Sequence, residues 1–205
     1  MTLAQRPPTL ALTLAAVASS RLGFEDDEPG LARAFVPAVA AMDEADRAYR
    51  RAIEMTLPSD VSALMLSAMA SFRARAHEVR ENARREIGDL YRKYGRDYGW
   101  FDPLDVYLPP AAGLSHADGT RVATMSDVAR SEVAAVRSRV NDTVMTRLEP
   151  VQLESLVAAK RRRHDAFATA IANALHAAVA GRPAAPAAAI DKVADQLVRL
   201  ADGWY

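Results

Sequence analysis

Residues 61–94, VSALMLSAMASFRARAHEVRENARREIGDLYRKY, carry the clearest structural pattern in this chain. Their apolar residues recur in steps of three and four, with an average of about 3.67 residues, the eleven-residue period of a long straight helix. At about 1.5 Å per residue, the pattern predicts a helix about 50 Å long. The residues that follow this period are Val61, Met65, Ala68, Phe72, Ala76, Val79, Ala83, Ile87, Leu90 and Tyr94.

The residues before this stretch predict another long helix, over 31–57. Pro37 is expected to kink this helix or to mark its start, because proline removes a helical hydrogen bond. Acidic and basic residues four apart, Asp43 with Arg47 and Asp46 with Arg50, indicate a solvated face. The opposite, inward side is expected to carry Met42, Ala45, Tyr49, Ala52 and Thr56.

Two further long helices and a shorter one are predicted after the central stretch. The third long helix should run over 126–148, with Thr124 and Asp127 as a capping box. The fourth covers 150–180 and carries His164 in its apolar row. Pro150 should either occupy the first turn of this helix or kink one longer helix. A last helix is expected to begin at Pro186.

The fold class that these patterns predict is all-α, since no segment has the alternation of a strand. We expect an elongated bundle of about four long helices, with a short N-terminal arm and a C-terminal helix. The predicted divisions are 1–23 for the arm, 24–181 for the bundle, and 182–205 for a linker and the last helix. The short connection at Leu57–Asp60 should make the first two long helices antiparallel neighbours.

The first 23 residues allow two interpretations. An uncharged apolar run from Thr9 to Ala18 follows Arg6 and resembles a secretory signal, with Ala16-Val17-Ala18 as a cleavage site. The alternative is a short amphipathic arm that ends at Gly23. In that case its leucines and valine pack on a partner surface, and these residues are Leu10, Leu14, Val17 and Leu22.

Composition limits the classes of function. The 26 basic and 26 acidic residues balance, so no net charge draws the protein to nucleic acid or to an acidic membrane. Cysteine is absent, which excludes disulfides and thiolate metal sites. No apolar run reaches the length of about 20 residues that a membrane span needs. We expect a cytoplasmic protein or a component of an assembly, with secretion as the alternative if a signal is present.

Aromatic residues gather around one long loop, predicted over 95–123. This region lacks helical periodicity and is rich in glycine and proline. Six of the chain's 13 aromatic residues fall between 91 and 107. We expect an ordered interaction loop that serves as a crossover or a subunit contact, and alternatively as a ligand pocket that includes His116. The candidate residues are Tyr91, Tyr94, Tyr98, Trp100, Phe101 and Tyr107.

Metal and cofactor sites are not predicted. His77-Glu78 begins like a zinc-protease helix, but Glu81 stands where that motif requires a second histidine. The pairs Glu78 with Glu81 and Glu86 with Asp89 resemble the ExxE and ExxD pairs of all-helical nucleotide pyrophosphohydrolases. In that family the pairs face each other from separate helices and hold magnesium. Here both pairs lie on one helix among arginines, which are expected to neutralise them.

The densest positive charge is the run Lys160, Arg161, Arg162 and Arg163. Four consecutive residues point around the whole circumference of a helix, so they do not form one flat basic face. They are nevertheless candidates for contact with phosphate or nucleic acid.

The sequence as a whole favours a non-catalytic structural or interaction protein. We expect it to self-associate or to bind a protein partner, as a component of a larger bacterial or phage assembly. A nucleic-acid- or phosphate-binding accessory protein that uses 160–163 is one alternative. An all-helical small-molecule binder or enzyme with a pocket at 91–116 is another.

Overall fold

A computed structural model describes residues 9–23, 28–95, 114–180 and 187–204. Every regular element in these ranges is a helix, so the predicted all-α class is confirmed. The predicted loop residues Tyr98, Trp100, Phe101 and Tyr107 lie outside the described ranges. The helices are α1 (Thr9–Leu22), α2 (Glu28–Thr56), α3 (Ser59–Arg92), α4 (His116–Met145), α5 (Pro150–Val179) and α6 (Ala187–Trp204).

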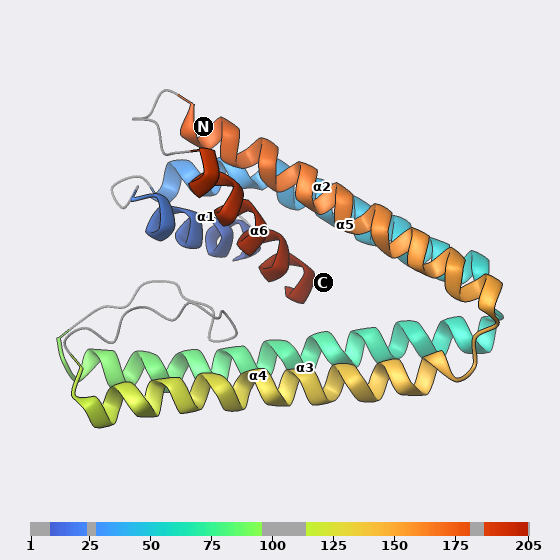
Figure 1. The fold of residues 1–205 in the computed structure, drawn as a ribbon, viewed down its shortest axis with the longest axis horizontal. Helices are drawn as coiled ribbons and strands as arrows, with labels where there is room; N and C mark the ends of the chain where they lie inside the picture. Colours follow the sequence, from blue (N-terminus) through green and yellow to red (C-terminus); the bar gives the residue numbers. More distant parts are fainter. Residues whose placement is uncertain (1–8, 24–27, 96–113, 181–186, 205) are drawn as a thin grey trace, which may run out of the picture. The chain divides into compact units, whose positions relative to one another are not determined.

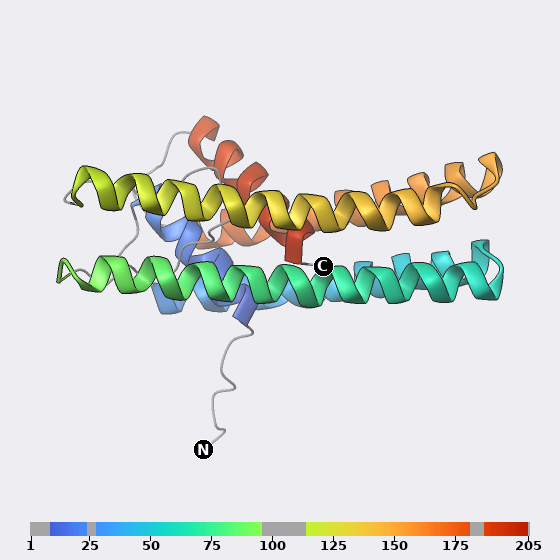
Figure 2. The same ribbon diagram turned by 90° about the horizontal axis from the view of Figure 1, so that it is seen from below.

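The chain divides into two compact units (Figures 1 and 2). The four-helix unit comprises Met1–Met55 and Glu154–Tyr205, and therefore contains α1, α6 and most of α2 and α5. The hairpin unit comprises Thr56–Leu153 and contains α3 and α4. The predicted limits at residues 23 and 181, and the predicted single bundle of four long helices, stay predictions.

The core of the four-helix unit draws on all four of its helices. Helix α1 packs against α6, and α2 and α5 run in opposite directions (Figure 1). Leu14 from α1, Phe35 from α2, Phe167 and Ile171 from α5, and Leu197 from α6 are all completely buried. The arm residues Leu10, Leu14 and Val17 are buried in this core and Leu22 is partly buried against it, so they pack on the chain itself, and the choice between an arm and a signal stays open. Gly23 follows the last turn with a φ of 73°.

Helix α5 has the predicted inward row in its second half, where Phe167, Ile171, Leu175 and Ala178 are buried, but not in its first half. His164, expected among the apolar residues, is exposed, and Val157 is 54% exposed. Arg163 is buried in place of His164, because its guanidinium finds acidic and aromatic partners inside the unit. Likewise Asp46 is buried on α2 rather than part of a solvated face. Pro150 occupies the first turn of α5, where its missing N–H is tolerated.

Helices α3 and α4 form an antiparallel hairpin (Figures 1 and 2). The predicted helix over 61–94 is confirmed, and Gly95 follows it with a φ of 67°, a conformation that favours glycine. Small buried clusters join the two helices, and they include Ile87 with Val122 and Ala83 with Ala129.

The start of α4 differs from the prediction. The helix begins at His116, ten residues before the predicted Ser126, so the loop is shorter than the predicted 95–123. Ser115 caps it: its hydroxyl accepts a hydrogen bond from the Asp118 amide at 3.2 Å and donates one to the Asp118 carboxylate at 3.0 Å. Thr124, expected to cap, instead donates to the Thr120 carbonyl within the helix at 3.0 Å.

Candidate functional site

The predicted interaction loop is described only at its two ends. Tyr91 is completely buried in a cluster with Ile87, Leu90 and Val122, so its ring is part of the core of the hairpin unit. Tyr94 is half-buried, and its hydroxyl donates a hydrogen bond to Asp118. The Ser115 amide lies 3.4 Å from the same hydroxyl.

Asp118 joins the end of α3 to the start of α4. Its carboxylate accepts hydrogen bonds from Tyr94, from Lys93 at 3.2 Å and from Ser115 at 3.0 Å. These donors, Tyr94 first, lower the pKa of Asp118 below its usual value. The carboxylate therefore stays ionised at neutral pH and fixes the corner between the two helices.

The predicted pocket near His116 is a wide hollow on the first turns of α4. It has a volume of about 560 Å³ and is lined by Leu114, Ser115, His116, Gly119, Thr120 and Ala123. Of the other residues predicted for it, Tyr91 is buried and does not line the hollow, and Tyr98 and Trp100 lie outside the described ranges. Ligand binding at this hollow stays a prediction.

The four residues of the basic run lie in different surroundings. Lys160, Arg161 and Arg162 are exposed, whereas Arg163 is only 7% exposed. The side chain of Arg163 is therefore not on the surface with the other three. Binding of phosphate or nucleic acid by the three exposed cations stays a prediction.

Arg163 belongs to a buried polar network that sequence reasoning missed. Its Nε lies 3.1 Å from Asp46 Oδ1 on α2, and one terminal nitrogen lies 3.5 Å from Asp202 Oδ1 on α6. Although the Nε distance is short, Nε has no partner in hydrogen-bond geometry. The interaction with Asp46 is thus an ion pair without a directed hydrogen bond.

The two carboxylates each have a second basic partner. Asp46 accepts a hydrogen bond from Arg50 at 2.8 Å, and Asp202 lies 2.7 Å from His164 Nδ1. Through Arg163, the network therefore links α2, α5 and α6.

Aromatic rings flank the Arg163 guanidinium. The guanidinium carbon lies 4.7 Å from the centre of the Phe167 ring and 5.7 Å from that of Tyr49, both within the range of cation–π attraction. Burial raises the pKa of the Tyr49 phenol, against the smaller opposing effect of Arg163. Tyr49 is therefore a neutral phenol at physiological pH.

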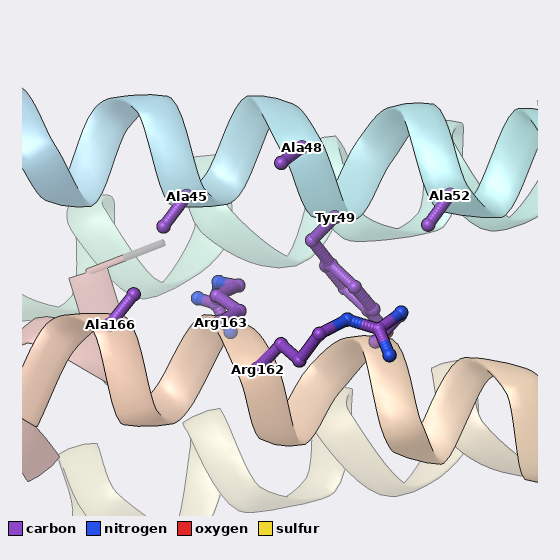
Figure 3. A pocket seen from close by; sticks show the side chains of 8 residues that line it. Ala45, Ala48, Tyr49, Ala52, Arg162, Arg163 and Ala166 are labelled. Atoms are coloured by element: carbon purple, nitrogen blue, oxygen red, sulfur yellow. The ribbon is translucent and has the colours of Figure 1, made fainter.

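A cavity adjoins this network between α2 and α5 (Figure 3). Tyr49 projects from α2 toward α5, and Arg162 and Arg163 project from α5 toward α2. The cavity has a volume of about 220 Å³. Its remaining walls are alanine methyl groups, from Ala45, Ala48, Ala52, Ala159 and Ala166.

Helical spacing contains a signal for the buried pair. Asp46 stands four residues after Met42 and three before Tyr49, and Arg163 stands four before Phe167. All three neighbours are buried. The inward rows of α2 and α5 therefore pass through Asp46 and Arg163. Both residues were missed from the sequence because charged side chains were assigned to the solvent-exposed faces.

The acidic pairs of α3 are engaged with arginines. Glu78 accepts a hydrogen bond from Arg75 at 2.8 Å, and Glu81 accepts one from Arg84 at 2.7 Å. Both carboxylates thus pair with an arginine of the same helix, but at a spacing of three residues rather than the expected four, and Glu78 pairs with Arg75 from outside the acidic stretch. Among the described residues, no three histidine or acidic side chains gather closely enough to hold a metal ion.

One part of α3 is apolar but poorly covered. Residues 61–72 carry no charge, and of the residues 63–75 none is buried. Val61 at its start is buried, and the large apolar side chains that follow are half-buried: Leu64, Met65, Leu66, Met69 and Phe72. We call residues 61–72 the uncharged segment.

None of the described helices combines the length and apolar character needed to cross a bilayer. Comparison with known proteins gives no match: no protein-family model, no curated protein and no solved structure matches this chain.

Proposed function

We propose that this protein is a structural or interaction protein that self-associates through the hairpin unit. The observation that supports this is the uncharged segment of α3, whose apolar surface is wider than contact with one neighbouring helix requires. Within a larger assembly, such a surface would join copies of the chain. The support comes from the angular distribution of its side chains, their partial exposure and the absence of charge.

The uncharged segment has two apolar rows. Met65, Ala68 and Phe72 continue the row that further along α3 contacts α4. At about 100° per residue, Met69 lies about 40° and Leu66 about 100° around the helix from Met65, on the side away from Ala68. The apolar face from Ala68 to Leu66 therefore spans about 160°, wider than the stripe of about 100° that packing against one partner needs. The second row is therefore available for another helix.

The proposed partner is a second copy of the same chain. In a twofold contact the same surface occurs on both sides, so its chemistry has to be complementary to itself. An uncharged row meets this condition, because it brings no like charges together and leaves no ion unpaired on burial. Pairing two hairpins in this way gives the four-helix arrangement common among helical bundles.

The contact is expected to be weak. A twelve-residue stretch of helix is about 18 Å long, at about 1.5 Å per residue. This length is short for an interface of about 800 Å² per partner, the usual size in stable complexes. Association should therefore depend on protein concentration.

Sedimentation velocity over a range of concentrations tests the proposal. The wild-type protein should shift from one chain to a larger species as its concentration rises. Leu66→Glu and Met69→Glu should keep the mass of one chain, because each places a charge in the second row. Ser67→Glu is the matched control, since Ser67 is exposed in the same segment and lies about 100° further around the helix from Leu66.

A wild-type protein that has the mass of one chain at every concentration would refute the proposal. Unchanged association of Leu66→Glu, with normal helix content by circular dichroism, would refute it as well.

A further inference from the structure

The cavity beside Arg163 is lined mostly by small apolar side chains. Five of the eight residues that line it are alanines, and the others are Tyr49, Arg162 and Arg163. The cavity is open to solvent on one side, where its wall residues Ala48 and Arg162 are exposed. The volume of about 220 Å³ corresponds to about seven waters at about 30 Å³ each. The space is thus large enough for a small organic molecule.

Arg163 supplies a buried cation with unused hydrogen-bonding capacity at this cavity. More than nine-tenths of the residue is buried, and the Nε–H donates to no acceptor. Its contacts with Asp46 and Asp202, at 3.1 Å and 3.5 Å, are ion pairs outside hydrogen-bond geometry. A guanidinium has five N–H donors and binds a carboxylate best through two of them. An added carboxylate could therefore accept bonds that these neighbours do not take.

A positive charge stands at the entrance of the cavity. Within the network itself, Arg50 and Arg163 balance Asp46 and Asp202, two charges of each sign. Arg162 lies outside this set, and it is exposed and lines the same cavity, so it can meet an anion at the entrance.

We propose that the cavity between α2 and α5 is a binding site for a small monocarboxylic acid with a compact apolar body. The carboxylate would pair with Arg162 and with the free donors of Arg163. The apolar body would lie against the alanine methyl groups and the ring of Tyr49. This site lies in the four-helix unit, so it does not depend on the proposed self-association through the hairpin unit.

Binding of benzoate to the protein tests this proposal. The alanine methyl groups are labelled with ¹³C, and their signals are followed by NMR as benzoate is added. We expect saturable shifts of the signals from Ala45, Ala52, Ala159 and Ala166. Benzyl alcohol and benzylamine, which have the same ring without the negative charge, should give no saturable shift at the same concentrations.

Variants at the entrance make the test specific. Ala48→Leu should abolish saturable binding, because the larger leucine side chain would occupy space in the cavity that Ala48 lines. The variant should still fold, because Ala48 is exposed and leucine has a high helix propensity. Arg162→Gln should weaken benzoate binding about threefold, the effect of losing one exposed charge contact. Arg161→Gln is the matched control, because Arg161 is exposed on the same helix but does not line the cavity. Its affinity should equal that of the wild type.

Several results would overturn the proposal. The first is shifts that never saturate in the wild-type protein. The second is equal binding of benzyl alcohol or benzylamine, which would show that the charge plays no part. The third is undiminished binding by the folded Ala48→Leu variant, which would place benzoate elsewhere.

Discussion

Asp46 and Arg163 are charged residues whose burial needs compensation. Their side chains are 6% and 7% exposed, and each is the other's nearest opposite charge across α2 and α5. Removing one partner of such a pair leaves an uncompensated buried charge, which is more costly than losing both. The pair therefore acts as a constraint on how α2 and α5 align.

Breaking this pair should reveal the coupling directly. Asp46→Ala should lower the free energy of unfolding by about 3 kcal/mol, because Arg163 would keep its charge inside the unit. Adding Arg163→Met to this variant should restore part of that loss, since methionine fills the space without a charge. Urea unfolding followed by circular dichroism measures both. Strictly additive effects of the two substitutions would contradict this account.

Asp118 gives the corner between α3 and α4 a dependence on pH. Its pKa is lowered in the folded protein, so its contribution to stability is complete above the unfolded value of about 4 and is lost as the pH falls below it. Asp118→Asn should remove this dependence from the first turn of α4. Amide exchange of Gly119 and Thr120 near pH 6 and near pH 3 measures it. Equal acid sensitivity in wild type and variant would exclude the role.

Periodic apolar rows predicted the helices well where packing alone determines them. The row from Val61 to Tyr94 gave the length of α3, and the row of Leu10, Leu14 and Val17 gave the packing of α1. The predicted start of α4 was wrong because the apolar residues among 116–121 do not recur at helical spacing. There the Ser115 cap and its bonds to Asp118 determine where the helix begins.

Helix α1 contributes to stability as a core element of the four-helix unit. Leu14 is completely buried, whereas Leu12 on the same helix is only partly buried. Leu14→Ala should lower the free energy of unfolding by about 3 kcal/mol, the usual range for a leucine deleted from a core. Leu12→Ala is the control and should lower it by less than half as much. Urea unfolding checks both, and equal effects would contradict the assignment of α1 to the core.

The candidate sites were harder to predict from the sequence than the helices. Arg163 was predicted as a surface cation, but its side chain lies inside the unit with Asp46, Tyr49 and Phe167. The contacts with Asp46 and Tyr49 join residues more than one hundred positions apart, and no local pattern encodes them. Spacing from Phe167 gives the inward direction of Arg163, but only the fold supplies its partners.

At the scale of the whole molecule, the two units have different proposed roles. The four-helix unit has a shared core and a buried ionic network, and a small cavity lies beside that network. The hairpin unit has small buried clusters toward one end and the uncharged segment toward the other. We infer that the first unit supplies most of the stability and the second supplies the contact between copies.

Hydrogen–deuterium exchange at two protein concentrations tests self-association most directly. If copies pair through the uncharged segment, the amides of residues 61–72 should exchange more slowly at high concentration, while those around Ile87 should be unchanged. Leu66→Glu should remove the difference. Exchange of residues 61–72 that is identical at both concentrations, although a larger species is present at the higher one, would contradict the claim that this segment is the contact.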